Sequence, residues 1–144
     1  RNPVISQSRE LYHENDFYPL EELGRLELLD GNEEIAPGVG VVLTGGYKIG
    51  HQIVLVGYGG ERVVFLGDLI PTHHHLMSTV VSAYDDFTVE SEKEKQNILD
   101  QAARDGWLLV FSHGYNHHAG YIQERKNKEE RNGRYFRPVN LATI

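Results

Sequence analysis

The chain has 144 residues and a mass of 16.4 kDa, with 40% hydrophobic and 24% charged residues and a formal net charge of -7. This length and composition are typical of one globular domain. Cysteine is absent, which excludes disulfides, thiolate metal ligands and a cysteine nucleophile. No apolar stretch approaches the ~18 residues that span a bilayer, and no signal-like core precedes the first elements, so we expect a soluble, cytoplasmic protein with no membrane partner.

The two ends of the chain carry separate information. The chain begins with Arg1 and its only methionine is Met77, so we expect a processed or partial chain. Residues 121–144 form a basic segment with six basic and three acidic side chains. Because the acidic side chains interrupt the basic ones, we expect a solvated terminal segment and no nucleic-acid partner.

The first predicted elements are short. Residues 6–15 are compatible with a helix, and residues 26–29 with a strand that ends at an Asp-Gly-Asn turn. The β-branched run at residues 39–44 predicts a second strand, and the glycine pair at residues 45–46 predicts a sharp change of direction.

A hairpin is predicted next. Residues 53–58 and 62–66 are apolar strands joined through a glycine pair at residues 59–60. The run at residues 63–66 has no polar alternation, so we expect cover on both of its faces.

The clearest helix begins near Thr88, which we take as its N-cap. Acidic residues occupy its first turns, an apolar stripe follows at residues 98–103, and Gly106 predicts its end. Residues 107–111 then form a buried strand. This order predicts an α/β or α+β fold with one mixed sheet in a single domain spanning residues 1–144.

Polar residues follow the ends of the two most apolar strands. Asp68 comes directly after the strand at residues 62–66 and its glycine, and His113 follows the strand at residues 107–111. Strand ends are where a sheet presents ligands and catalytic groups. A carboxylate and an imidazole that converge from separate loops suit zinc, non-haem iron or manganese. The alternative is that Asp68 is a turn or cap residue.

The histidine runs at residues 73–75 and 117–118 are weaker candidates. Neighbouring side chains diverge, so at most one or two of the histidines at residues 73–75 can bind one ion, and an exposed loop is the alternative. A serine hydrolase is disfavoured because the chain has no Gly-x-Ser-x-Gly elbow.

The order of three motifs resembles the second half of the metallo-β-lactamase-fold hydrolases. These are the segment 44–52 (TGGYKIGHQ), the strand end 65–69 (FLGDL) and the strand end 111–113 (FSH). They correspond to the family's T-x-G-H-x-x-G-H segment, its strand ending in G-D and its final S-H strand. The stretch at residues 67–76 and the AYD at residues 83–85 are most similar to lactonase-type and uncharacterised hydrolases of the family.

The resemblance implies the C-terminal half of a four-layer αββα sandwich, a mixed sheet with flanking helices, and two metal ions at one edge. Asp68 matches the carboxylate that bridges the ions, and His113 matches the last histidine ligand, on the second ion. His51 and His75 fall at supporting positions around the metal. In the family the ions polarise the scissile carbonyl and supply a hydroxide nucleophile for ester, lactone, thioester or amide hydrolysis.

Two departures from the family pattern concern the ligands. The H-x-H-x-D-H motif, which supplies four ligands, is absent, and Tyr47 occupies the position of a ligand histidine. Two ligands do not make a stable zinc site. We therefore assign no catalytic side chain and expect no competent hydrolase from this chain alone. Two hypotheses remain: the C-terminal portion of a metal-dependent hydrolase, or a metal-poor relative that acts as a binding or structural module.

The partners follow from the same half-fold. Only one long amphipathic helix is predicted, so one apolar face of the sheet would remain exposed. Soluble monomers rarely expose an apolar face of this size. We expect either the missing N-terminal half or a second copy of the chain, as a homodimer, on that face. A small-molecule substrate is implied, and Tyr84, His73 and Tyr115 are the candidate residues for contacting it.

Overall fold

The computed structural model describes residues 13–124 and 134–139. The chain divides into two compact units, residues 1–30 and residues 31–144, and each is described by itself.

The first unit contains one described helix, α1 (Glu14–Glu22), which has Pro19 inside it and no buried side chain. The helix predicted at residues 6–15 lies mostly outside the described residues. The strand predicted at residues 26–29 is wrong, because this segment has no regular structure and two of its three leucines, Leu26 and Leu28, are exposed. A β-branched or apolar run forms a strand only where a neighbouring strand and a packed face support it.

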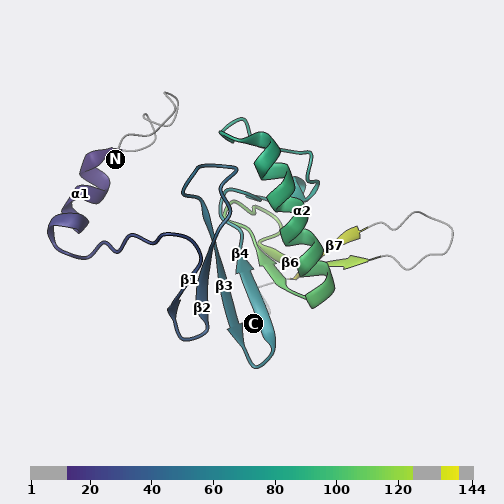
Figure 1. Cartoon of the computed structure of the whole chain (residues 1–144). Helices are drawn as coiled ribbons and strands as arrows, with labels where there is room; N and C mark the ends of the chain where they lie inside the picture. Colours follow the sequence, from purple (N-terminus) through teal and green to yellow (C-terminus); the bar gives the residue numbers. More distant parts are fainter. Residues whose placement is uncertain (1–12, 125–133, 140–144) are drawn as a thin grey trace. The chain divides into compact units, whose positions relative to one another are not determined.

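The second unit is built on a seven-stranded sheet in which the strands follow one another in chain order (Figure 1). β4 and β5 pair in parallel and all other neighbours pair antiparallel, so the sheet is mixed, as predicted. The strands are β1 (Glu33–Ala36), β2 (Val39–Leu43), β3 (Gln52–Tyr58), β4 (Glu61–Phe65), β5 (Leu108–Val110), β6 (Ala119–Glu124) and β7 (Arg134–Val139).

The crossover between β4 and β5 carries the main helix. Parallel neighbours need such a connection, and here it contains the 3-10 helix η2 (His73–Leu76) and α2 (Thr88–Asp105). The predicted N-cap is wrong: Phe87 precedes the helix, and its amide donates to the carbonyl oxygen of Gly46. A contact with another loop, rather than a capping side chain, therefore fixes the start of α2. Among the described residues, no helix is both long and apolar enough to cross a bilayer.

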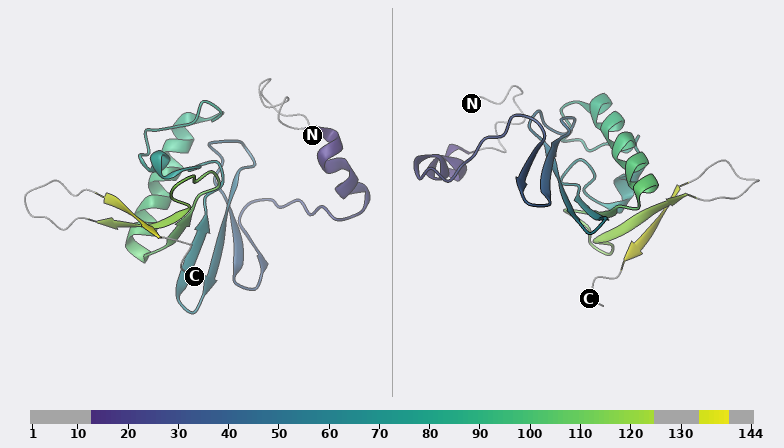
Figure 2. Two further views of the ribbon diagram at one scale, coloured as in Figure 1. Left: turned by 180° about the vertical axis from the view of Figure 1, so that it is seen from behind. Right: turned by 60° about the horizontal axis from the view of Figure 1, so that its bottom comes forward.

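The core lies between α2 and one face of the sheet (Figures 1 and 2). Val64 of β4 stands opposite Leu55 of β3 and Leu109 of β5, and all three belong to this face. Ile98 and Leu99 of α2 pack against them. The predicted apolar stripe of the helix therefore faces the sheet.

The opposite side of the sheet, here called the open face, is also apolar but is not buried. Paired residues of neighbouring strands share a face, so the register places six apolar side chains together. Phe65 and Val56 are 44% and 43% exposed, and the others are partly exposed. We expect cover on both faces of residues 63–66, and the described residues of the second unit bury only one of these faces. The open face consists of Val54, Val56, Val63, Phe65, Leu108 and Val110.

The C-terminal strands correct the prediction of a solvated terminal segment. β7 pairs with β6 over its whole length, and Ile122 is buried opposite Phe136. Gly120 lies under the ring of Phe136, where a Cβ atom would collide with it. Charge counting missed this pairing because the apolar residues of the segment alternate with basic ones.

The loop after β2 packs its backbone directly on α2. Gly46 has a φ of +65°, and a Cβ atom there would lie 2.8 Å from the Cα atom of Ser91. No side chain fits at this contact without moving either the loop or the helix.

Gly46→Ala is therefore expected to lower the free energy of unfolding by about 2–4 kcal/mol, from the left-handed backbone and the collision with Ser91. Gly50→Ala is the matched control, because Gly50 lies in the same loop with open space around its Cβ position. We expect that control to change stability by no more than about 0.5 kcal/mol in urea unfolding. Equal stabilities of the two variants would contradict the packing described here.

Candidate metal centre

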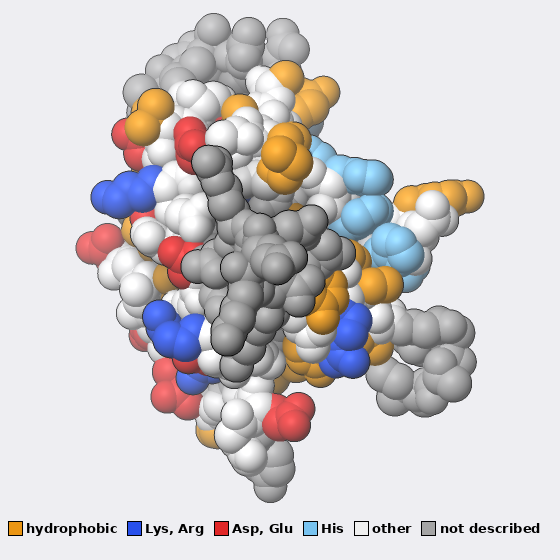
Figure 3. All heavy atoms as spheres, turned by 90° about the vertical axis from the view of Figure 1, so that its right-hand side faces the viewer, with side chains coloured by type: hydrophobic (Ala, Val, Ile, Leu, Met, Phe, Trp, Pro, Cys, Tyr) orange, Lys and Arg blue, Asp and Glu red, His pale blue; other side chains and the backbone are white. Residues whose placement is uncertain are grey.

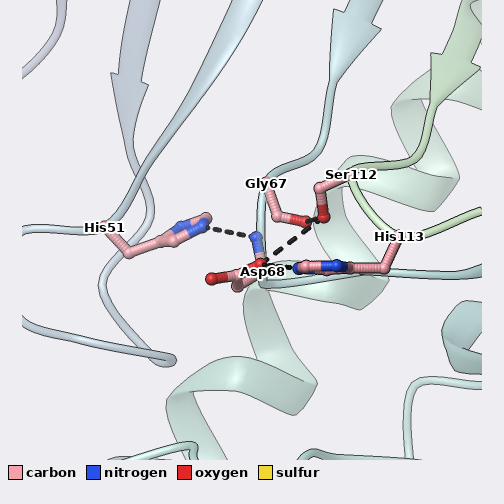
Figure 4. Close-up of polar contacts among 5 residues, drawn as sticks. All are labelled: His51, Gly67, Asp68, Ser112 and His113. Atoms are coloured by element: carbon pink, nitrogen blue, oxygen red, sulfur yellow. Dashed lines mark hydrogen bonds and ion pairs between the residues drawn. The ribbon is translucent and has the colours of Figure 1, made fainter. Parts of the chain in front are cut away.

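Asp68 and His113 meet at one edge of the sheet. Each follows one strand of the parallel pair, Asp68 after β4 and His113 after β5, so both loops leave the sheet on the same side. The Nε2 atom of His113 lies 3.0 Å from the Oδ1 atom of Asp68 (Figure 4). The two side chains are 67% and 39% exposed, so the pair is open to solvent and to a ligand.

Three contacts hold the Asp68 side of the pair. The backbone N–H of Asp68 donates to the Nε2 atom of His51 over 3.1 Å. The hydroxyl of Ser112 donates to the carbonyl oxygen of Gly67 over 2.8 Å and lies 3.5 Å from Oδ1 of Asp68 (Figure 4). Because this hydroxyl is committed to a backbone carbonyl, the neighbouring His113 does not activate it as a nucleophile.

His51 has a defined protonation state. Its Nε2 atom accepts a hydrogen bond, so the ring proton is on Nδ1, which lies 2.7 Å from the hydroxyl oxygen of Thr44. Burial lowers the pKa of His51, although the charges of Asp68 and Asp85 oppose this effect. A neutral ring with both nitrogens in use is not available as a metal ligand. The structure thus places His51 behind Asp68, and its supporting role stays a prediction.

The loop that carries Tyr47 is clamped to the segment before α2. The Nζ atom of Lys48 lies 2.7 Å from Oδ1 of Asp86 and donates to the carbonyl oxygen of Tyr84 over 2.7 Å. The backbone N–H of Asp86 in turn donates to the carbonyl oxygen of Tyr47 over 3.0 Å. The Tyr47 ring stands edge-on to the His51 ring, with 5.5 Å between the centroids. Tyr47 therefore contacts His51, and His51 in turn accepts the backbone N–H of the candidate ligand Asp68.

A second buried lysine fixes the loop beyond Asp68. Lys95 of α2 is fully buried and its Nζ atom donates to the carbonyl oxygens of Met77 and Val80. Burial lowers the pKa of Lys95, and the nearby charges of Asp85 and Glu92 oppose the shift. Both carboxylate oxygens of Asp85 are buried without a hydrogen-bond partner.

His75 belongs to the same loop. Its Nδ1 atom lies 2.8 Å from the hydroxyl oxygen of Thr72. Burial lowers the pKa of His75, and the charge of Lys95 adds to the effect. The predicted supporting position of His75 has no direct contact with Asp68 or His113 among the hydrogen bonds found, and its role stays a prediction.

Sequence reasoning missed both buried lysines. Lys95 carried a usable signal, because residues 91, 95, 98, 99 and 102 are the buried positions of α2 and follow its helical period. Lys48 carried none, since its burial depends on Asp86, which is 38 residues further along the chain.

The donor set fits part of a metal site. Asp68 and His113 offer a carboxylate oxygen and an imidazole nitrogen, which zinc, iron and manganese accept. Within residues 13–124 and 134–139, no group of three or more histidine or acidic side chains is arranged to hold an ion. The described residues therefore supply two ligands of a centre that needs at least three.

The sequence and fold define the class of protein. A profile of the Metallo-beta-lactamase superfamily matches residues 2–113 of the chain. The match covers more than half of the chain and includes Asp68 and His113, and the chain belongs to this superfamily. The resemblance read from the three motifs is thereby confirmed.

Solved structures of the superfamily are similar to the chain. A probable metal-dependent hydrolase from Staphylococcus aureus is 26% identical with a TM-score of 0.67, over 83% of this chain and 42% of that one. The hydrolase AbOPH is 18% identical with a TM-score of 0.75, over 89% and 43%. The dizinc quorum-quenching lactonase AidC is 17% identical with a TM-score of 0.67, over 89% and 45%. The chain thus spans less than half the length of these structures. A comparison with curated proteins gives no match.

A separate cluster of histidines packs around Phe136. The His73 ring lies 3.8 Å from the His74 ring and 4.8 Å from the His117 ring, between centroids, and stacks on Phe136 at 5.8 Å. Figure 3 shows histidine side chains gathered on one face beside hydrophobic ones. Burial, followed by the charges of His74 and His117, lowers the pKa of His73 from its ordinary value of 6.5.

Acidification is expected to weaken the fold through His73. As the pH falls through 6.5, the unfolded chain takes up the proton at His73 before the folded chain does, so the free energy of unfolding decreases. Urea unfolding at about pH 7.5 and 5.5 should show a smaller loss for His73→Gln than for the wild type. His118→Gln is the control, because His118 is exposed. Its decrease in the free energy of unfolding between these two pH values should equal that of the wild type. An unchanged loss in His73→Gln would contradict the prediction.

The clamp on the Tyr47 loop gives a second prediction. Lys48→Met is expected to lower the free energy of unfolding by about 2–4 kcal/mol, because it removes the largely buried cation that lies 2.7 Å from Oδ1 of Asp86. Arg104 also pairs with an aspartate but is 67% exposed, and Arg104→Met should cost at most about 1 kcal/mol. Thermal and urea unfolding measure both variants, and equal losses would show that burial does not strengthen the clamp.

Proposed function

We propose that the chain is the C-terminal part of a metal-dependent hydrolase whose centre is completed by side chains from the rest of the fold. The observation that supports this most is the Asp68–His113 pair, with 3.0 Å between Oδ1 and Nε2. The pair is positioned by surrounding residues and accessible, yet the described residues add no third ligand to it. These are the features of an incomplete metal site rather than of a structural ion pair.

The proposed substrates are small molecules with an ester, lactone, thioester or amide carbonyl. When bound, zinc, iron or manganese would polarise such a carbonyl and lower the pKa of a water molecule. Asp68 and His113 would act as ligands of the bound metal. Ser112 and His51 would orient Asp68 through its neighbour Gly67 and its own backbone N–H.

The open face supports the same proposal. Its six apolar side chains lie on the side of the sheet away from α2, and a contiguous apolar area of this kind marks an interface in a soluble protein. We propose that the N-terminal half of the sandwich covers it and brings the remaining ligands to the sheet edge. A second copy of the chain is the alternative occupant, and a chain that sediments as a dimer without binding metal would favour it.

Tyr47 favours the second candidate function, a metal-poor relative that binds or scaffolds another molecule. A phenol in place of a ligand histidine weakens a metal centre, and the loop around Tyr47 is fixed. The two candidates differ in metal content, which the following experiment measures.

In the full-length gene product that contains this chain, Asp68→Asn and His113→Ala are each expected to lower zinc affinity at least about tenfold and to abolish hydrolysis of an acyl-lactone and aryl-ester panel. His74→Ala is the control, because His74 is an exposed histidine outside the pair. Metal content is measured by elemental mass spectrometry and affinity by competition with a chelating dye.

A wild-type protein that holds less than about a tenth of an equivalent of metal, even after metal is added, would exclude the hydrolase proposal. Retention of affinity and activity by both variants would exclude Asp68 and His113 as ligands.

A further inference from the structure

The loop after β2 carries a tyrosine, Tyr47, next to His51, a residue that supports the candidate centre. The Tyr47 ring contacts the His51 ring at 5.5 Å, and His51 accepts the N–H of Asp68. The loop cannot easily present another side chain there. Its backbone is bonded on both sides of Tyr47 to the segment before α2, through the carbonyl oxygens of Gly46 and Tyr47.

No described side chain takes the place of a ligand at this position. Both ring nitrogens of His51 are engaged, by Thr44 and by Asp68. The Nζ atom of Lys48 donates to Asp86 and lies 5.2 Å from the centroid of the Tyr47 ring. A protonated ammonium group has no lone pair and cannot bind a metal ion. The described residues therefore contribute two candidate metal ligands, Asp68 and His113, and Tyr47 contacts His51.

A phenol is a poor substitute for an imidazole at neutral pH. An ordinary tyrosine has a pKa near 10, so about one phenol in a thousand is ionised at pH 7. A neutral imidazole needs to lose no proton before its nitrogen binds zinc, whereas a phenol does. An ion whose ligand set includes this position is expected to lose most of its affinity, while an ion bound by Asp68 and His113 is expected to keep its affinity.

We propose that the completed centre of this protein holds one tightly bound ion, at Asp68 and His113, and that Tyr47 leaves the second ion position without a working ligand. The inference rests on the proposed function. It distinguishes this protein from AidC, which is a dizinc lactonase.

The test compares metal stoichiometry in the wild type, Tyr47→His, Tyr47→Phe and Tyr84→His. The full-length gene product is passed over a chelating resin and its zinc content is measured by elemental mass spectrometry. Metal-free protein is also titrated with Co²⁺ and followed by its visible absorption. Tyr84→His is the matched control, because Tyr84 is 64% exposed and the variant adds a histidine outside the position of Tyr47.

The wild type and Tyr84→His are expected to hold about one equivalent, and Tyr47→His about two. Tyr47→Phe should also hold about one, because the phenol is not a ligand; this variant keeps the proposal testable if Tyr47→His does not fold.

Two outcomes overturn the inference while the proposed function stands: about two equivalents in the wild type, or about one equivalent in a folded Tyr47→His. No metal in the wild type would overturn the proposed function itself.

Discussion

The parallel pairing of β4 with β5 is the constraint on which the candidate centre depends. The pairing sends the loops of Asp68 and His113 from the same edge of the sheet, where Oδ1 and Nε2 lie 3.0 Å apart. A parallel pair needs a long crossover, and this crossover contains α2, which covers one face of the sheet. The same connection that builds the core therefore also brings the two candidate ligands together.

The loops around this pair are held by charged groups inside the protein. Lys48 joins the loop after β2 to Asp86, and Lys95 holds the backbone of the loop after η2 through two carbonyl oxygens. Buried charges are costly unless they are paired or hydrogen-bonded, so the contacts of these two lysines constrain the loops that they hold. A fixed sheet edge beside an open apolar face is what the proposed half-site requires.

The sequence predicted β2 to β5 and the extent of α2, because apolar runs bounded by glycines and one clear helical stripe carry local signals. It also placed Asp68 and His113 at strand ends, and the structure brings them together. It did not predict β1, β6 and β7. All four residues of β1 are exposed, and the pairing of β6 with β7 joins segments whose basic residues indicate a solvated tail. The clamp of Lys48 on Asp86 depends on a contact between distant segments, which no local pattern encodes.

Anomalous diffraction from crystals of the full-length gene product grown with zinc is the most direct test of the account. We predict an ion peak about 2.0–2.2 Å from both a carboxylate oxygen of Asp68 and the Nε2 atom of His113, with further ligands from outside the described residues. A peak elsewhere, with Asp68 and His113 still bonded to each other at the sheet edge, would contradict it.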